Sequence, residues 1–386
     1  MNRFRLGIYE ELGVRPIINA GGTFTYLGGS MMEPEVLAAM NDAAKHFVDM
    51  AELAKRAGEI VAEITGAGAG LVTSGAAASL AFAAAGCMTG MDPAKVARLP
   101  DTTGMKNEIV VQRKHRNPHD HHLRVTGVKL VEVGDMFRTS SWEVEAAINE
   151  RTAALVYFIY DPMPGTLSLE KNIELAHAHN LPIIVDAAAE VPPFENLRNF
   201  TDMGVDLVAF SGGKAILGPN DTGILIGRKD LIEASSMNAF PEDYPKPFGA
   251  FGIGRTMKVS KEQIVGLVVA LKRYAKRDHK ADMNRWKKMA EFMARELNVI
   301  PNMKASVVIL EQNPRPICIP KIEVSIDERA SGMSASELVK RLITEEPRIA
   351  VVHWPSYHRS IYLNPQCLLD GEEKIVVNRI KSILSP

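Results

Sequence analysis

Asp206-Leu-Val-Ala-Phe-Ser-Gly-Gly-Lys214 is a short apolar segment that ends in a serine, two glycines and a lysine. Its apolar part, residues 207–211, has the length and continuous hydrophobicity of a strand that is covered on both faces of a sheet. A second apolar strand is predicted almost directly after it, at residues 222–227. A lysine in a glycine turn is by default a solvated side chain, so the interpretation of Lys214 depends on its neighbours.

Strands and helices alternate on the N-terminal side of this segment. We predict strands at residues 108–112, 128–133, 153–160 and 183–186, and helices at residues 76–88, 141–149 and 168–179. Such alternation is typical of a mainly parallel, doubly wound α/β sheet with helices on both faces. Ligands of these sheets bind outside the carboxyl ends of the strands. Polar residues at those ends are therefore the candidates for a functional site.

The preceding predicted strand, Leu181-Pro-Ile-Ile-Val-Asp186, ends in an aspartate. A lysine and an aspartate at neighbouring strand ends are the two groups that pyridoxal phosphate (PLP) chemistry needs. The lysine forms a Schiff base with the cofactor, and the carboxylate keeps the pyridinium nitrogen protonated. The small residues after Asp186, among them Ala188, leave room beneath a flat ring. The alternative is an aspartate that caps the following helix.

An alanine-rich helix is predicted to begin directly after Ser74-Gly75, where a short strand breaks into a turn. A helix N-terminus offers unpaired backbone N–H groups and a positive dipole end, so Ser74, Gly75 and Ala76 are candidates to hold a phosphate. Ser211, just before the lysine turn, could add a hydroxyl to the same phosphate. The alternatives are an alanine helix packed in a core and a serine that caps a turn.

His115 follows the predicted strand at 108–112, and its imidazole could stack on the cofactor ring. His119, His121 and His122 lie close by in the sequence and compete for this role. A histidine cluster can also hold a metal, but no carboxylate pattern completes a site here. We therefore predict no metal, and the residues alone leave the choice of stacking group open among these four histidines.

The composition is that of an ordinary globular protein. The formal net charge is −1, so no global field favours nucleic acid or an anionic membrane as a partner. The three cysteines have no metal-ligand spacing, and their odd number argues against a disulfide framework, which fits a reducing cytoplasm. The N-terminus lacks a secretory apolar core, and no stretch approaches the roughly 18 apolar residues of a membrane span.

A chain of 386 residues exceeds the usual size of one domain. We predict an N-terminal arm at residues 1–50 and a large cofactor-binding domain at 51–260. One long, charge-striped helix at 261–297 is expected to link it to a small α+β domain at 298–386.

Four segments together resemble one family. They are residues 18–23, 185–193, 210–230 and 252–262, and the resemblance extends in order over nearly the whole chain. These segments are similar to the selenocysteine synthase (SelA)-like branch of fold-type I PLP-dependent enzymes. Within that branch they look most like D-glucosaminate-6-phosphate ammonia-lyases.

The resemblance implies the aspartate aminotransferase-like fold, with a mainly parallel seven-stranded sheet in the large domain and a smaller α+β C-terminal domain. It also implies a homodimer, or a higher homo-oligomer, with active sites at the interface. Lys214, Asp186 and His115 would be the catalytic residues, with His115 as the group that stacks on the cofactor ring. The other residues that would surround the cofactor are Ser74, Gly75, Ala76, Ala188 and Ser211.

The expected substrate side departs from the family's pattern. Many fold-type I enzymes bind the substrate carboxylate with an arginine on a strand of the small domain, and Tyr362 stands at the position aligned with it. Arg359 or Arg348 might take its place, and Thr23 and Arg255 are the other candidates. This departure argues against an ordinary aminotransferase. For a substrate phosphate, the candidate cations at the pocket mouth are Arg113, Arg116, Arg255 and Lys258.

The resemblance implies a lyase. Lys214 would remove the Cα proton of an amino sugar acid, the β-hydroxyl would leave, and a 2-keto-3-deoxy acid and ammonia would result. The alternative is another reaction of the same branch: a racemase, an aldolase, a β-eliminase or a selenium transferase. A cofactor-binding protein without turnover is a third hypothesis, which the presence of both Lys214 and Asp186 disfavours.

Overall fold

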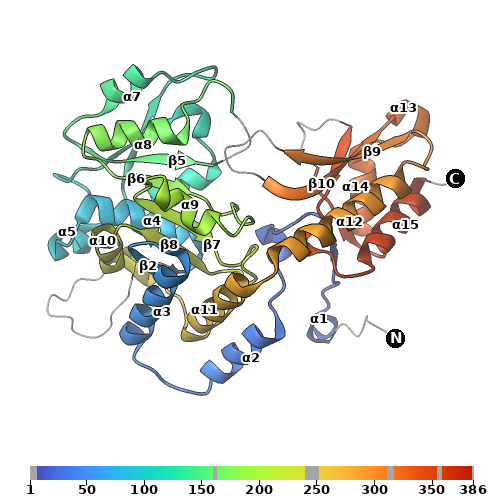
Figure 1. Ribbon diagram of the computed structural model, residues 1–386, viewed down its shortest axis with the longest axis horizontal. Helices are drawn as coiled ribbons and strands as arrows, with labels where there is room; N and C mark the ends of the chain where they lie inside the picture. The colour runs from blue at the N-terminus through green and yellow to red at the C-terminus, as the bar shows by residue number, and fades with distance from the viewer. Residues whose placement is uncertain (1–6, 160–162, 240–251, 311–316, 354–358, 385–386) are drawn as a thin grey trace. The chain divides into compact units, whose positions relative to one another are not determined.

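The computed structural model describes residues 7–159, 163–239, 252–310, 317–353 and 359–384 (Figure 1). The chain divides into two compact units. The larger unit is built mainly from Met31–Arg277. The smaller unit combines the N-terminal Met1–Ser30 with two C-terminal stretches, Asp278–Glu311 and Pro316–Pro386.

A seven-stranded sheet forms the centre of the larger unit. Its strands, in the order in which they pair, are β2 (Ala69–Thr73), β8 (Gly223–Gly227), β7 (Leu207–Ser211), β6 (Ile183–Asp186), β5 (Thr152–Phe158), β3 (Glu108–Gln112) and β4 (Lys129–Val133). Among these described strands, β8 alone runs against its neighbours. The prediction of a mainly parallel, seven-stranded sheet is therefore confirmed.

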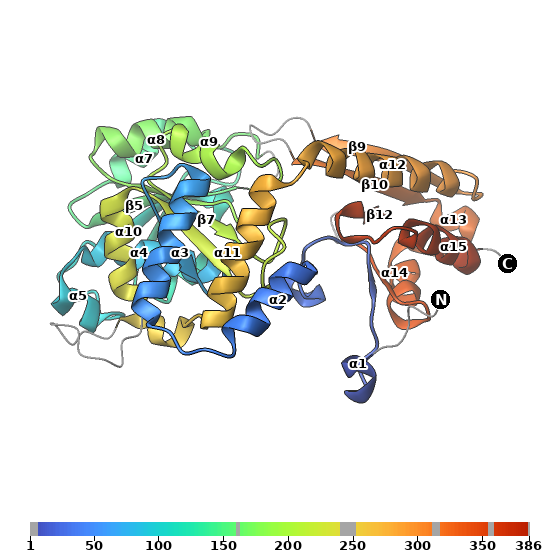
Figure 2. The same ribbon diagram turned by 60° about the horizontal axis from the view of Figure 1, so that its bottom comes forward.

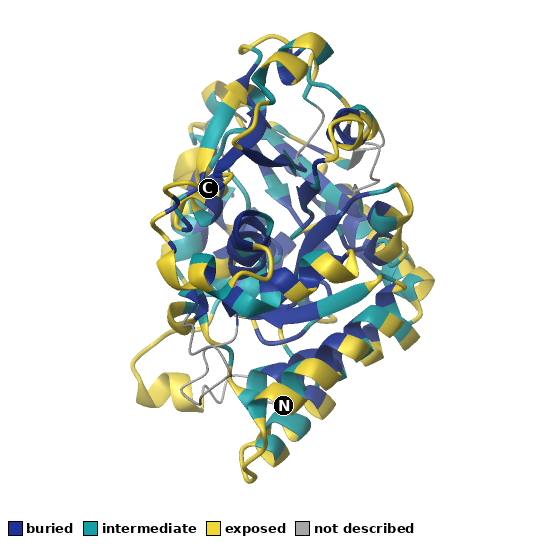
Figure 3. Ribbon diagram, turned by 90° about the vertical axis from the view of Figure 1, so that its left-hand side faces the viewer, coloured by how far each residue is buried: buried dark blue, intermediate teal, exposed yellow. Residues whose placement is uncertain are grey.

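Both faces of this sheet are covered, which explains why its strands are continuously apolar. Successive residues of β6 show this directly: Ile183 and Val185 belong to one core cluster and Ile184 to the other. On the first face lie α3 (Met50–Thr65) and α11 (Lys261–Lys276), side by side in Figures 1 and 2. The exposed residues gather on the outward faces of the helices (Figure 3).

The second face is covered by α4 (Gly75–Thr89) and α10 (Lys229–Ala239), which pack on each other. Most of α4 is buried because its small alanines allow close approach. The other helices of the larger unit are α2 (Pro34–Ala43), α5 (Pro93–Arg98), α6 (His121–Arg124), α7 (Ser141–Ala147), α8 (Leu169–Ala178) and α9 (Asn196–Asp202), with short 3₁₀ helices η2 (Arg113–His115), η3 (Pro118–Asp120) and η4 (Ile253–Met257).

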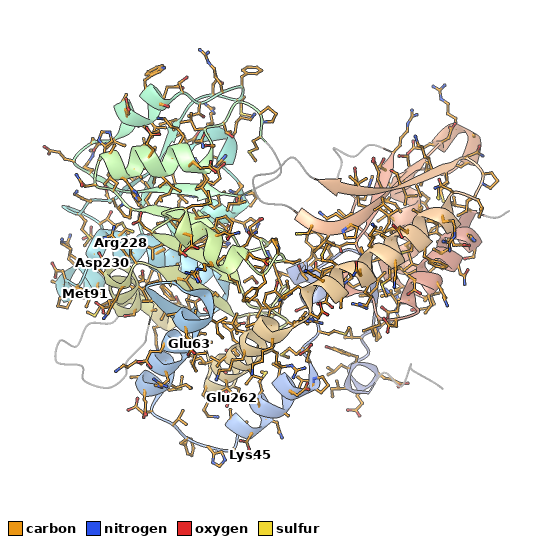
Figure 4. The ribbon with its side chains drawn as sticks, in the orientation of Figure 1. Lys45, Glu63, Met91, Arg228, Asp230 and Glu262 are labelled. Carbon is orange, nitrogen blue, oxygen red and sulfur yellow. The ribbon has the colours of Figure 1, made fainter. Side chains whose placement is uncertain are left out.

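A buried carboxylate ties together the strand ends that lie opposite the candidate site. Asp206, just before β7, accepts hydrogen bonds from the backbone N–H of Ile183 at 2.9 Å and from Arg228 at 3.0 Å. Arg228, just after β8, also pairs with Asp230 at 2.6 Å (Figure 4). These bonds fix β6, β7 and β8 relative to one another, and hence the positions of the side chains at their other ends.

The smaller unit has its own hydrophobic core. Its antiparallel sheet has the order β12 (Ser360–Leu363), β10 (Ile317–Ile326), β9 (Met303–Leu310). Its helices are α1 (Ile8–Glu11), α12 (His279–Leu297), α13 (Glu328–Ser331), α14 (Ala335–Thr344) and α15 (Glu372–Leu384), with the 3₁₀ helices η1 (Thr25–Leu27) and η6 (Pro365–Cys367). Part of the predicted N-terminal arm forms β1 (Ile18–Asn19), which pairs in parallel with β11 (Ile349–Ala350).

Two boundaries differ from those predicted from the sequence. Residues 261–297 form two helices, α11 and α12, because Arg277 is extended and Asp278 caps a new helix through the N–H of Ala281. Residues 31–50 group with the larger unit, where α2 packs on α11 and Glu33 forms an ion pair with Arg273. In the described parts of the chain, no helix combines the length and hydrophobicity needed to cross a membrane.

Candidate active site

The polar ends of the strands meet along one edge of the larger unit's sheet. Because β8 is antiparallel, its first residue, Gly223, stands at this edge between the last residues of two neighbours, Thr73 of β2 and Ser211 of β7. Asp186, the last residue of β6, comes next and pairs with Ala209 of β7. Adjacent strands are about 4.8 Å apart, so β2 and β6 are separated by about 14 Å along this edge.

Lys214 follows β7 in a turn that is folded tightly onto the next segment. A Cβ built on Gly213 would overlap Asn220, and one built on Gly212 would overlap Thr222. Burial lowers the pKa of the Lys214 amine, while the carboxylates of Asp186 and Glu190 oppose this shift. The lysine is thus within electrostatic reach of Asp186, and it deprotonates more readily than an ordinary lysine.

The carboxylate of Asp186 is half-buried and oriented by the chain that follows it. Its Oδ1 accepts a hydrogen bond of 3.0 Å from the N–H of Ala188. The N–H of Ala187 continues the pairing with β7 through the carbonyl of Ala209, also at 3.0 Å. The next helix, α9, begins at Asn196, which leaves Asp186 well outside its first turn. The alternative role as a helix cap is therefore wrong.

The turn between β2 and α4 presents backbone donors at the same edge. Gly75 has a φ of +85°, and the absence of a side chain at Gly223 lets this turn approach β8 closely. Within the described residues, no side chain caps the first turn of α4. The hydroxyl of Ser74 donates instead to the carbonyl oxygen of Met257, at 2.6 Å. The backbone N–H groups at the start of α4 are thus left without a side-chain cap from Ser74, as an anion-binding helix N-terminus requires.

These residues fit PLP in their chemistry. The N-terminus of α4 suits a phosphate dianion, Asp186 suits a pyridinium nitrogen, and Lys214 suits an aldehyde because its pKa is lowered. Ser211 is buried between these groups, in register with Gly223. The larger unit thus brings together the predicted residues Ser74, Gly75, Ala76, Asp186, Ala188, Ser211 and Lys214.

The four neighbouring histidines have distinct surroundings. His115 is buried, and its ring meets the ring of Tyr157 edge to face, with 4.5 Å between centroids. His119 and His122 lie with their ring centroids 5.7 Å apart. Burial lowers the pKa of His122, as does His119, whereas Asp186 acts in the opposite direction. His122 is thus within electrostatic reach of Asp186, while His115 packs on β5.

A buried carboxylate holds the histidine segment in place. Asp120 is only 2% exposed and accepts hydrogen bonds from Arg116 Nε at 2.5 Å and Arg124 Nε at 3.0 Å. Arg116 also pairs with Glu132 of β4, as does Arg113 at 3.8 Å. Both arginines were considered as cations for a substrate phosphate, and in the structure they have these partners. The role of Asp120 was not predicted from the sequence. An arginine four residues before it and another four residues after it could have indicated that role.

The predicted substrate residues fall in both units. Arg255 lies in η4 of the larger unit and is exposed, whereas Thr23 and Arg359 belong to the smaller unit. Thr23 follows a turn in which Asn19 Oδ1 accepts the N–H groups of Gly21 and Gly22. These three roles stay predictions.

Two further observations bear on the predicted substrate and metal chemistry. Arg348, the other possible carboxylate ligand, donates to the carbonyl oxygens of Ile343 and Arg15. In the described parts of the chain, no group of three or more histidine, cysteine, aspartate or glutamate residues could hold a metal ion.

The chain is similar to known proteins over most of its length. The family model described as aminotransferase class-V matches residues 34–330. The chain is 35% identical to a D-glucosaminate-6-phosphate ammonia lyase of Salmonella typhimurium, over 97% of both chains. It is 33% identical to a 5'-C-glycyluridine monooxygenase-decarboxylase of a Streptomyces species, over 97% of this chain and 92% of that protein.

A solved structure and a selenium transferase are also similar to this chain. A solved structure of a D-glucosaminate-6-phosphate ammonia-lyase superposes with a TM-score of 0.83 at 34% identity, over 98% of both chains. An L-seryl-tRNA(Sec) selenium transferase of Aquifex aeolicus is 27% identical over 59% of this chain and 53% of its own length. The chain therefore belongs to the aminotransferase class-V family and is a PLP-dependent enzyme of fold type I.

Proposed function

We propose that this enzyme is an ammonia-lyase that acts on an amino sugar acid of the D-glucosaminate-6-phosphate class. The observation that carries the proposal is similarity over 97% of both chains, at 35% identity, to an enzyme whose name states this substrate and reaction. A 2-amino-3-hydroxy acid would lose water and then regain it as ammonia is released. The net products are a 2-keto-3-deoxy acid and ammonia.

The roles of the chain's own residues follow from their surroundings. When bound, PLP supplies an electron sink for the charge that develops at the substrate's α carbon. The lowered pKa of Lys214 favours its unprotonated amine, which can accept the α proton. Asp186 would hold the positive charge at the ring nitrogen, and His115 is proposed as the group beside the ring. The first turn of α4 and Ser211 would hold the cofactor's phosphate.

The names of other relatives state other reactions, which are the alternatives to the lyase reaction. The Streptomyces relative, at 33% identity, carries the name of an oxidative decarboxylase. A selenium transferase acts on a tRNA-bound substrate, which a basic surface would favour, and the net charge of −1 disfavours it. Thr23, Arg255 and Arg359 are our candidates for substrate binding in the lyase reaction.

A homodimer with active sites at its interface is part of the proposal. The N-terminal helix α1 supports it, because none of its four described residues is buried and Ile8 and Tyr9 are exposed. Leu12 and Val14, directly after it, are exposed as well. We also propose a reducing cytoplasm, which the odd number of cysteines in the sequence supports. The mass of the particle in solution, measured by light scattering, tests the dimer.

Ammonia release from D-glucosaminate-6-phosphate, compared with a panel of amino acids, tests the proposed reaction. We expect release from the sugar acid phosphate, accompanied by a 2-keto acid in equal amount. The variant Lys214→Ala should abolish release and remove the visible absorbance of the bound cofactor. Release of ammonia from an ordinary amino acid alone, or consumption of oxygen during turnover, would contradict the lyase proposal.

A further inference from the structure

Ser74 joins two segments that are far apart in the sequence. Its Oγ donates a 2.6 Å hydrogen bond to the carbonyl oxygen of Met257, across a separation of 183 residues. Ser74 is the residue directly before α4, at the proposed phosphate site, and Met257 is the last residue of η4. The same 3₁₀ helix carries Arg255.

The start of η4, together with Gly252 just before it, packs closely against the end of α10. A Cβ built on Gly252 would lie 2.7 Å from the Cα of Asn238, and one built on Gly254 would overlap the carbonyl oxygen of Ala239. Asn238 is itself fully buried. The segment therefore fits closely on α10 at its start, and the bond from Ser74 fastens its last residue to the start of α4.

The chemistry of the hydroxyl limits what else Ser74 can do. A serine hydroxyl has one proton to donate, and a phosphate dianion only accepts hydrogen bonds. Because the proton of Ser74 is directed at Met257, this hydroxyl has no donor left for a phosphate. Backbone N–H groups at the start of α4, which point along the helix axis, do not compete with that bond.

We propose that Ser74 is a positioning residue that fastens the Arg255 segment to the anion-binding turn, and that its hydroxyl is not a ligand of the phosphate. This inference rests on the proposed phosphate site at the start of α4. An anion that orders the turn then also orders η4 through Ser74. The site of the cofactor and the position of Arg255 are thereby coupled.

Hydrogen–deuterium exchange of the full-length protein, read from peptides covering residues 253–257, tests the coupling. In Ser74→Ala we expect exchange in this segment to be at least five-fold faster, with the Kd for PLP within three-fold of wild type. Ser74→Thr, which keeps a hydroxyl, should restore the protection. Ser211→Ala should weaken PLP binding at least ten-fold and, with PLP at saturation, leave exchange at 253–257 within two-fold of wild type.

Thr256→Ala is the matched control, because Thr256 Oγ1 also donates to a backbone carbonyl, that of Ile253 at 2.9 Å, but within η4 itself. Its exchange should stay within two-fold of wild type. Unchanged exchange in Ser74→Ala, or a loss of PLP affinity as large as in Ser211→Ala, would overturn the proposal. If the wild type released no ammonia from any substrate, the proposed reaction would be wrong. The exchange experiment would still test the positioning role of Ser74, because it does not depend on turnover.

Discussion

Gly223, the first residue of β8, lies so close to Gly75 that a Cβ built on it would overlap the carbonyl carbon of Gly75 and crowd the backbone nitrogen of Ala76. The two glycines belong to different strand ends of the sheet edge, and Gly223 stands in register with both Thr73 and Ser211. The close approach sets the path of the turn that precedes α4. We therefore expect the proposed phosphate site to depend on the absence of a side chain at Gly223.

Replacement of Gly223 by alanine should displace this turn. We expect the affinity for PLP to fall at least ten-fold, because the backbone N–H groups at the start of α4 would no longer converge on the phosphate. Overpacking of this kind typically also destabilises a fold by about 1–3 kcal/mol. PLP titration followed by fluorescence and urea unfolding of the apoprotein measure the two effects.

Gly21→Ala is a suitable control for this experiment. A Cβ at Gly21 would meet its nearest neighbour, the side chain of Leu27, at an ordinary 3.4 Å. Its PLP affinity and its free energy of unfolding should match those of the wild type. Equal PLP affinity in Gly223→Ala and Gly21→Ala would show that the close approach of Gly223 to Gly75 is not needed for the site.

The lowered pKa of Lys214 should appear in the pH dependence of cofactor uptake. Only the unprotonated amine reacts with the aldehyde, so the rate of PLP uptake by the apoprotein should rise with pH through the pKa of Lys214. Burial lowers that pKa, and Glu190 opposes the shift. We therefore expect the midpoint to lie below that of an ordinary lysine, and to move to still lower pH in Glu190→Gln.

Stopped-flow absorbance over a series of pH values measures this midpoint. The exposed variant Glu195→Gln, five residues further along the chain, serves as the control and should leave the midpoint unchanged. A shift to higher pH in Glu190→Gln would contradict the sign of the Glu190 effect.

Local patterns in the sequence were sufficient to predict the strands that position the site. The bounds of β3, β6 and β7 are the predicted ones, because each is an apolar run that ends at a polar or turn-forming residue. Lys214 and Asp186 could be singled out since both follow such runs. Their proximity then followed from the rule that places ligands at the carboxyl ends of parallel strands.

Relationships between distant segments could not be predicted in this way. The pairing of Ile18 with Ile349 forms a strand within the predicted N-terminal arm, and no local hydrophobic period indicates it. The bond from Ser74 to Met257 likewise depends on tertiary packing. From the sequence, Arg116 was predicted as a cation for a substrate phosphate. In the structure it pairs with Glu132, which comes from the next strand, β4. In the sequence, the break between α11 and α12 at Arg277 is indicated only by the helix-capping aspartate that follows it.

Two partly buried cysteines, Cys87 and Cys367, should react slowly with thiol reagents. Burial, as the main cause, raises the pKa of Cys87 to about 12, and nearby Asp206 adds to the shift. Burial also raises the pKa of Cys367 to about 11. Because the thiolate is the reactive form, the raised pKa leaves very little of Cys87 reactive at pH 7. Mass mapping after a brief maleimide pulse should find both unlabelled in the native protein and labelled in urea. Labelling of Cys87 at equal rates in the two states would contradict this.

Asp120→Asn should destabilise the larger unit and change its response to acid. The variant loses the charge that attracts Arg116 and Arg124, and breaking such a buried, hydrogen-bonded pair typically costs about 3 kcal/mol at neutral pH. Burial raises the pKa of Asp120, but the hydrogen bonds from the two arginines outweigh it and hold the pKa below its usual value. Stability from a carboxylate with a depressed pKa is present above its unfolded-state pKa, about 4, and is lost as the pH falls through the folded-state pKa.

Urea unfolding at pH 7 and at pH 3 measures both parts of this prediction, and the difference between wild type and Asp120→Asn should shrink at the lower pH. Asp202→Asn is the matched control, since Arg198 and Asp202 form the same pair four residues apart, at 3.1 Å, on an exposed surface. Exposed pairs contribute about 0–1 kcal/mol, so this variant should unfold almost like the wild type. Equal destabilisation by the two variants would mean that burial does not strengthen the Asp120 pair, and that the histidine segment is held by other contacts.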